Sequence, residues 1–217
     1  MTLRNATVLF ASLWLCLAAT FSARAHPHEF VEMKIGIVFD KAGKAAAMRY
    51  WWRFDEFFSA FALETAPTGA DGQPTQAGID AVLVEILGNI HGNAYFTRFD
   101  ENAGPVPPMA KANAGDAVFE NRQLTVSFTV PFKEPFALAG KKFAYAIYDK
   151  DFYIAMNHST DADAIEMVGA PKGCEAKIDA ADPSEDIASF AASLGRDESA
   201  EGDLGIHFAE WVTVSCP

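Results

Sequence analysis

The chain has 217 residues, of which 50% are hydrophobic and 12% aromatic, and it carries a formal net charge of −12 at pH 7. This apolar content excludes a largely disordered protein, and the excess of acidic residues disfavours nucleic acid and anionic lipid as partners. The charge favours cations or basic partners instead, with simple solubility as the alternative interpretation.

The first 25 residues have the pattern of a secretory signal peptide. Arg4 precedes an uncharged stretch from Val8 to Phe21, and alanines occupy the small-residue positions up to Ala25. The stretch is shorter than the roughly 20 apolar residues that a membrane-spanning helix needs. We therefore expect cleavage after Ala25, a periplasmic location, and one soluble domain over residues 26–217 without a membrane span.

Alternation of apolar and polar residues predicts β-strands along the mature chain. Residues 31–39 and 48–54 alternate in this way on either side of a turn at 40–44, which predicts a hairpin. Residues 101–117 contain three prolines and are expected to form a loop. Further strands are expected where the alternation returns, at 124–130, 143–147 and 204–214.

Other segments change to the helical period. Apolar residues recur at spacings of three and four from Ile79 to Ile90, which predicts an amphipathic helix. A shorter helix is expected from Pro183 to Leu194, with Asp182 as its N-cap. Asp55 is expected to cap a third helix, which is short and rich in phenylalanine.

The order of these elements predicts an α+β fold. We expect antiparallel sheets, for which a sandwich is one arrangement, with a helical insertion near 55–91 and a short helix near 183–194. The aromatic and aliphatic stripes of the helices are assigned to the core rather than to a cofactor pocket.

Two cysteines remain in the mature chain, Cys174 and Cys216. In an oxidising compartment an even pair predicts a disulfide, which would fix the C-terminal strand. The alternative is a metal site with two thiolate ligands.

Cleavage after Ala25 would give the mature chain an N-terminal histidine with a free α-amine. His26 could then bind a metal through its amine and its ring, and His28 shares a face with it in an extended segment. Such nitrogen ligands suit copper, nickel or zinc. Square-planar binding through backbone amides fails, because Pro27 has no amide proton to lose. The alternative is an exposed terminus without a role.

The other histidines have simpler structural explanations. His158 lies in a turn-like stretch and is expected at the surface, although it stays a candidate further ligand. His91 ends a predicted helix, where its ring would interact with the terminal carbonyl groups. His207 lies opposite the apolar set of the last predicted strand, so partial exposure is expected.

Several segments together resemble one bacterial family. They are His26 to Phe30, YWWRFDEFFSAF from Tyr50, TVSFTVPF from Thr125, YAIYDKDFYIA from Tyr145, GAPKGC ending at Cys174, and WVTVSCP with Cys216. The chain resembles domain-of-unknown-function family one thousand and seven, described as the periplasmic component of an uncharacterised transport system. Because its members are frequently associated with nickel and cobalt permeases, the resemblance implies transition-metal handling beside a membrane permease.

The resemblance also points to individual residues. It implies His26 and His28 as metal ligands, and Asp149 as an oxygen ligand or as a hydrogen-bond partner of a ligand. The alternative for Asp149 is a carboxylate that hydrogen-bonds its own loop. Members commonly carry a calcium-loop-like segment before the long helix, but residues 67–78 retain only Asp71 of the four carboxylates required, so no calcium site is expected.

Three functions are compatible with the sequence. The first is a binding protein that captures or delivers nickel, cobalt, zinc or copper beside a membrane transporter. The second is a copper oxidase with terminal histidine ligands, and the third is a structural or interaction module without a metal. We favour the first and expect no enzymatic activity, because the sequence lacks hydrolase and nucleotide-binding motifs.

Overall fold

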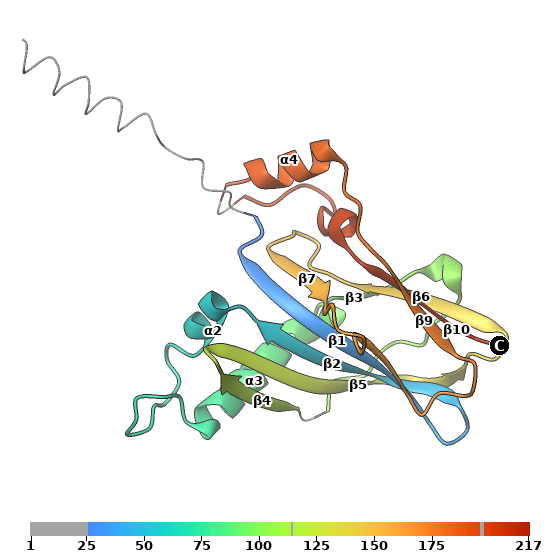
Figure 1. Ribbon diagram of the computed structural model, residues 1–217, viewed down its shortest axis with the longest axis horizontal. Helices are drawn as coiled ribbons and strands as arrows, with labels where there is room; N and C mark the ends of the chain where they lie inside the picture. Colours follow the sequence, from blue (N-terminus) through green and yellow to red (C-terminus); the bar gives the residue numbers. More distant parts are fainter. Residues whose placement is uncertain (1–25, 114, 196–197) are drawn as a thin grey trace, which may run out of the picture.

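The computed structural model describes residues 26–113, 115–195 and 198–217, so the predicted signal peptide lies outside the described residues. The strands lie in two sheets (Figure 1). The first contains β1 (Glu29–Phe39), β2 (Lys44–Phe54), β4 (Asp116–Glu120), β5 (Gln123–Ala137), β7 (Ile154–His158) and β8 (Ile165–Val168). The second contains β3 (Thr97–Phe99), β6 (Lys141–Ile147), β9 (Glu175–Asp179) and β10 (Trp211–Cys216). The predicted α+β class is confirmed.

The first sheet runs in the order β4-β5-β2-β1-β7, and β8 pairs with β1 beyond the end of β7. The second sheet runs in the order β3-β6-β10-β9. Antiparallel pairing dominates as predicted, but β7 and β8 both run parallel to β1. Apolar side chains from both sheets pack into one main core.

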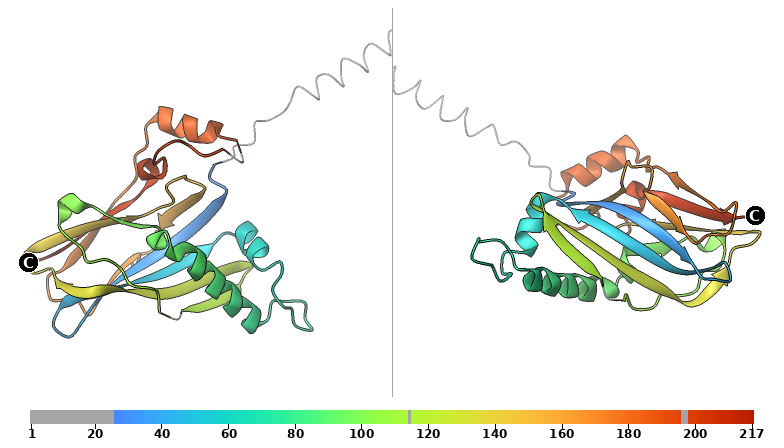
Figure 2. Two further views of the ribbon diagram at one scale, coloured as in Figure 1. Left: turned by 180° about the vertical axis from the view of Figure 1, so that it is seen from behind. Right: turned by 60° about the horizontal axis from the view of Figure 1, so that its bottom comes forward.

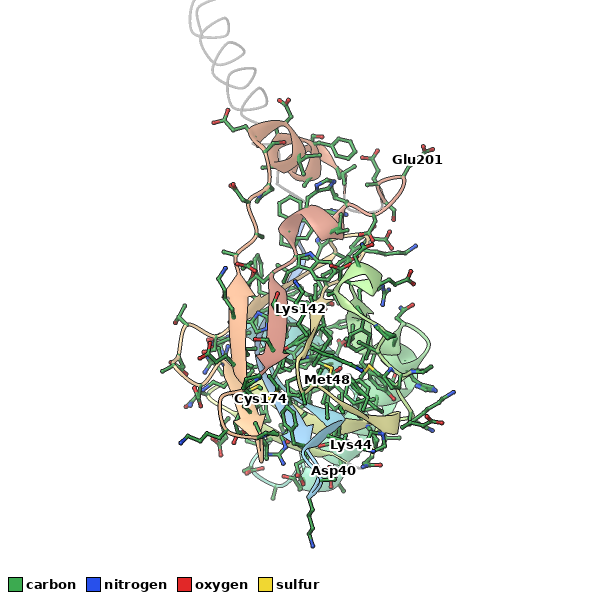
Figure 3. All side chains as sticks on the ribbon, turned by 90° about the vertical axis from the view of Figure 1, so that its right-hand side faces the viewer. Asp40, Lys44, Met48, Lys142, Cys174 and Glu201 are labelled. Atoms are coloured by element: carbon green, nitrogen blue, oxygen red, sulfur yellow. A yellow bond between two sulfur atoms is a disulfide. The ribbon has the colours of Figure 1, made fainter. Side chains whose placement is uncertain are left out.

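The predicted hairpin is confirmed and forms the centre of the first sheet. Val31 pairs with Phe54 near one end of β1 and β2, where their side chains are buried. The turn at the other end is closed by Asp40, whose Oδ1 accepts hydrogen bonds from the backbone N–H groups of Ala42 and Lys44. Figure 3 labels Asp40 and Lys44 in this turn.

The described helices are α2 (Glu56–Ala62), α3 (Gln76–His91) and α4 (Glu185–Ser193). Asp55 caps α2 as predicted, because its Oδ1 accepts from the Phe58 N–H at 2.9 Å. The long helix α3 packs on the inner side of the first sheet through Ile79 and Leu83 (Figure 2, left). Among the described residues, no helix is long and apolar enough to span a membrane.

The predicted start of α4 is wrong by two residues. Ser184 is the N-cap instead of Asp182, because its extended backbone lets its hydroxyl accept from the Ile187 N–H. The loop predicted at 101–117 is largely correct, although Glu101–Ala103 forms a 3₁₀ helix and β4 already begins at Asp116.

The last predicted strand is wrong in its first half. Gly205–Phe208 is a 3₁₀ helix, and it leaves His207 exposed. Gly205 lies so close to the preceding loop that a Cβ atom there would be 1.9 Å from the carbonyl oxygen of Asp149. Its N–H also donates to the carbonyl of Lys150. These contacts hold the segment in a turn despite its alternating pattern.

Cys174 and Cys216 form the predicted disulfide, and Figure 3 labels Cys174 beside β9. The bond joins residues 42 positions apart and holds the end of β10. Replacing both cysteines with serine should lower the free energy of unfolding by about 4 kcal/mol, because the unfolded chain regains the entropy of an open loop. Urea denaturation at neutral pH measures the change. Reduced wild-type protein is the control, and an unchanged midpoint in the variant would contradict the prediction.

Candidate functional site

The two N-terminal histidines lie together against a tyrosine ring. The ring centroids of His26 and His28 are 5.0 Å apart, and the Tyr153 ring lies 4.4 Å from the first and 5.5 Å from the second. The Tyr153 carbonyl accepts from the N–H groups of His28 and Glu29, and its hydroxyl donates to the Glu198 carbonyl. The segments that precede β1 and β7 therefore form one cluster of rings. We call His26 and His28 the histidine pair.

The His26 ring is buried without satisfying its polar atoms. The residue is 5% exposed, and neither ring nitrogen has a hydrogen-bond partner among the described residues. Burying such an atom unpaired costs about 1–3 kcal/mol. A neutral imidazole nitrogen is also a common ligand of transition metals. A metal ion bound through His26 would therefore fit this site chemically and remove the cost.

Carboxylates surround the start of β1. The pKa of Glu29 is raised to about 7, mainly by burial and in smaller part by the nearby negative charges of Asp55 and Asp149. Asp55 also accepts from the Phe30 N–H at 2.8 Å while it caps α2, so it fixes α2 beside the start of β1. Negative charge concentrated in this way favours a bound cation.

The Asp149 carboxylate hydrogen-bonds its own loop, which is the alternative that the sequence left open. Its Oδ2 accepts from the N–H groups of Tyr153 at 2.9 Å and Ile154 at 3.3 Å. These contacts fix the backbone that carries the Tyr153 ring. Asp149 thus positions the tyrosine, and its charge acts on Glu29.

The structure does not bring His158 to the histidine pair. His158 lies opposite Met33, four positions along from the pairing of Glu29 with Ile154, which is about 13 Å at the rise of a parallel strand. The expected surface position is wrong, because His158 belongs to β7 and its side chain is 2% exposed.

His158 is held by a glutamate from the second sheet. Its Nδ1 lies 2.8 Å from Oε2 of Glu210, and the same oxygen accepts from its backbone N–H at 2.6 Å. Glu210 directly precedes β10, so this contact joins the two sheets. A structural role therefore explains the burial of His158.

The remaining candidates lie elsewhere. His91 ends α3 as predicted, and its Nδ1 lies 3.1 Å from the hydroxyl of Tyr95. In the part of the chain that the structure describes, no three His, Cys, Asp or Glu side chains are arranged to hold a metal ion. The rings of the histidine pair could provide two nitrogen ligands, and the expected cleavage after Ala25 would add the α-amine as a third.

One residue of the site, Tyr153, is absent from the sequence predictions. Tyr153 falls within YAIYDKDFYIA, where it follows the predicted strand at 143–147. No spacing in the sequence shows that its ring reaches the N-terminus. Its presence in a segment that carries the family resemblance is the one signal that could have drawn attention to it.

Comparison with known proteins identifies a family but no activity. The profile of a family described as "Protein of unknown function (DUF1007)" matches residues 11–216. The chain is also similar to an uncharacterized protein of Haemophilus influenzae, with 26% identity over 210 residues. This similarity covers 94% of the present chain and 98% of the relative.

Hydrogen bonds from His158 make the stability of the fold depend on pH through Glu210. Burial acts to raise the pKa of Glu210, but the bonds from the ring and backbone N–H of His158 lower it below its ordinary value. The ionised carboxylate therefore stabilises the fold above its unfolded pKa, and this contribution is lost as pH falls through the folded pKa. Glu210→Gln should cost about 1 kcal/mol at pH 7, allowing for partial solvent screening.

The cost should begin to shrink as the pH falls below the ordinary glutamate pKa of about 4.3, and it should disappear only at a lower pH, where the folded wild-type carboxylate is protonated as well. Urea denaturation of both proteins at several pH values tests this. Glu201→Gln is a matched control, because Glu201 is exposed and should change stability little at any pH. A loss of stability that stays constant from pH 7 to pH 3 would contradict the prediction.

Proposed function

Because the chain belongs to the family described as "Protein of unknown function (DUF1007)", whose description assigns no activity, we propose a function from the site itself. The protein binds a transition-metal ion, which is nickel, cobalt, zinc or copper, at the histidine pair and delivers it to a membrane permease from the periplasm. The observation that carries this proposal is the buried His26 ring, whose two nitrogens lack hydrogen-bond partners among the described residues.

The proposed ligands are ring nitrogens of His26 and His28 and the α-amine of His26. Tyr153 packs on both rings and limits their orientations, so less conformational entropy is lost when a metal binds. Nitrogen donors of this kind bind late first-row divalent ions more strongly than early ones. The acidic groups around Glu29 add an attraction for any cation.

Two further observations support this proposal. The disulfide between Cys174 and Cys216 suits an oxidising compartment such as the periplasm. It also engages both mature cysteines, which removes the alternative of a metal site with two thiolate ligands.

The decisive experiment places one extra residue in front of His26. Protein secreted and processed to begin at His26 should bind nickel, copper or zinc with a Kd of about 1 μM or tighter in calorimetry. The extended protein keeps both imidazoles but moves the free amine away, so its affinity should fall at least about tenfold, the equivalent of 1.4 kcal/mol. His207→Ala is the matched control, because His207 is exposed in a different element and should leave binding unchanged.

Each other result has a definite meaning. Equal binding by the processed and the extended protein would remove the amine from the site. Absence of binding in both would favour an interaction module without a metal. Oxygen consumption by the copper-loaded protein in the presence of a reductant would favour the copper oxidase instead, because a delivery protein should leave its ion redox-silent.

A further inference from the structure

The outer face of the first sheet is hollowed at Gly36. In the right-hand view of Figure 2, no helix crosses in front of β1 and β2 on this face. Gly36 pairs with Arg49 on β2 and with Glu166 on β8, and it contributes no side chain between them. A groove of about 510 Å³ lies here across β1, β2, β5 and β8, and we call it the Gly36 groove. Its volume is in the usual range of small-molecule sites.

An aromatic ring forms one wall of the Gly36 groove. Trp51 lies between Lys34 on β1 and Ser127 on β5 in the strand register, so its indole stands among polar neighbours. The Lys34 amine is 5.7 Å from the ring centroid, and it is paired with Asp161 at 2.9 Å and Asp163 at 2.8 Å. The Arg53 guanidinium carbon is 5.6 Å from the same centroid, and Arg53 is paired with Glu32. The wall thus combines an aromatic ring with two cations that are already paired with carboxylates.

The opposite wall carries polar groups with unused hydrogen-bonding capacity. The Arg49 guanidinium and the Glu166 carboxylate are 3.9 Å apart, which is beyond hydrogen-bonding distance. Their side chains are 51% and 62% exposed. No other described residue makes a hydrogen bond with the Arg49 guanidinium or the Ser127 hydroxyl. Donors and acceptors therefore both point to solvent around the hollow.

These features define the chemistry of a ligand. The two cations and two carboxylates that line the groove cancel in formal charge, so a charged ligand would leave one sign unpaired. Hydroxyl groups both donate and accept, which matches the mixture of guanidinium, carboxylate and serine. The apolar face of a pyranose ring can pack on an indole. We propose that the Gly36 groove binds a pyranose unit of a neutral saccharide.

This site is separate from the histidine pair. His28 directly precedes β1 and Gly36 lies eight residues further along the extended chain, which corresponds to about 26 Å. Saccharide binding and metal binding can therefore be measured independently, and the failure of one leaves the other unaffected.

The test is saturation-transfer NMR with maltotriose, cellotriose and the trimer of N-acetylglucosamine. At least one should bind, with a Kd on the order of 1 mM because the groove is open to solvent. Trp51→Ala should raise that Kd about tenfold, since it removes the ring wall. Gly36→Val should do the same by filling the groove floor, because an added Cβ atom would lie 3.3 Å from Cβ of Arg49 and the valine methyl groups would extend beyond it.

Phe57→Ala is the matched control, because Phe57 is an aromatic residue that is 79% exposed on another element. It should leave saccharide binding unchanged. Thermal unfolding of every variant shows whether the fold is kept, and Arg49→Ala replaces any variant that fails to fold. Binding of none of the three saccharides would overturn the proposal. Equal binding by the Trp51 variant would also overturn it. So would binding of glycylglycine, a zwitterion with two charged ends, in place of the saccharides.

Discussion

The parallel pairing of β1 with β7 and β8 is the interaction on which both candidate sites depend. Parallel strands run in the same direction, so the residues that precede them meet at one edge of the sheet. His26 and His28 precede β1 and Tyr153 precedes β7, which explains why these three rings pack together. Beyond the end of β7, β8 continues the same pairing and brings Glu166 beside Gly36.

The parts of the fold that could be predicted from the sequence are those fixed by local chemistry. The hairpin follows from a period of two on both sides of a turn, and α3 follows from a helical period over four turns. The caps show the limit of such rules, because Asp55 caps α2 as expected whereas Ser184 replaces Asp182 at α4. Where two capping residues stand close together, the backbone conformation decides between them.

The parts that could not be predicted depend on distant segments. The strands β7, β8 and β9 have only four or five residues, which is close to the shortest length over which alternation predicts a strand. Asn157 to Thr160 has the composition of a turn, yet His158 pairs with Met33 of β1 as part of a strand. The Met33 carbonyl also accepts a hydrogen bond from the Ser159 N–H. Pairing with β1 therefore overrides local preference there.

The candidate metal site shows the same division between local and distant information. The histidine pair could be identified from the sequence, because His26 and His28 directly follow the predicted cleavage site and His26 would then have a free α-amine. Its surroundings are not evident, because Glu29 has a raised pKa only where the fold brings Asp55 and Asp149 to it. Protonation of Glu29 limits the repulsion among these carboxylates when no cation is present.

The two faces of β1 explain how one strand can carry function without weakening the core. Its inner residues, Val31, Met33, Ile35 and Ile37, are buried, and the period of two places Glu32, Lys34 and Gly36 on the other face. A glycine within a strand interior loses packing and conformational entropy. Here Gly36 is buried beneath side chains of β2 and β8 on the face away from the main core, so no core contact is lost. The hollow is therefore compatible with a stable hairpin, because the pairing of Gly36 with Arg49 is made by the backbone alone.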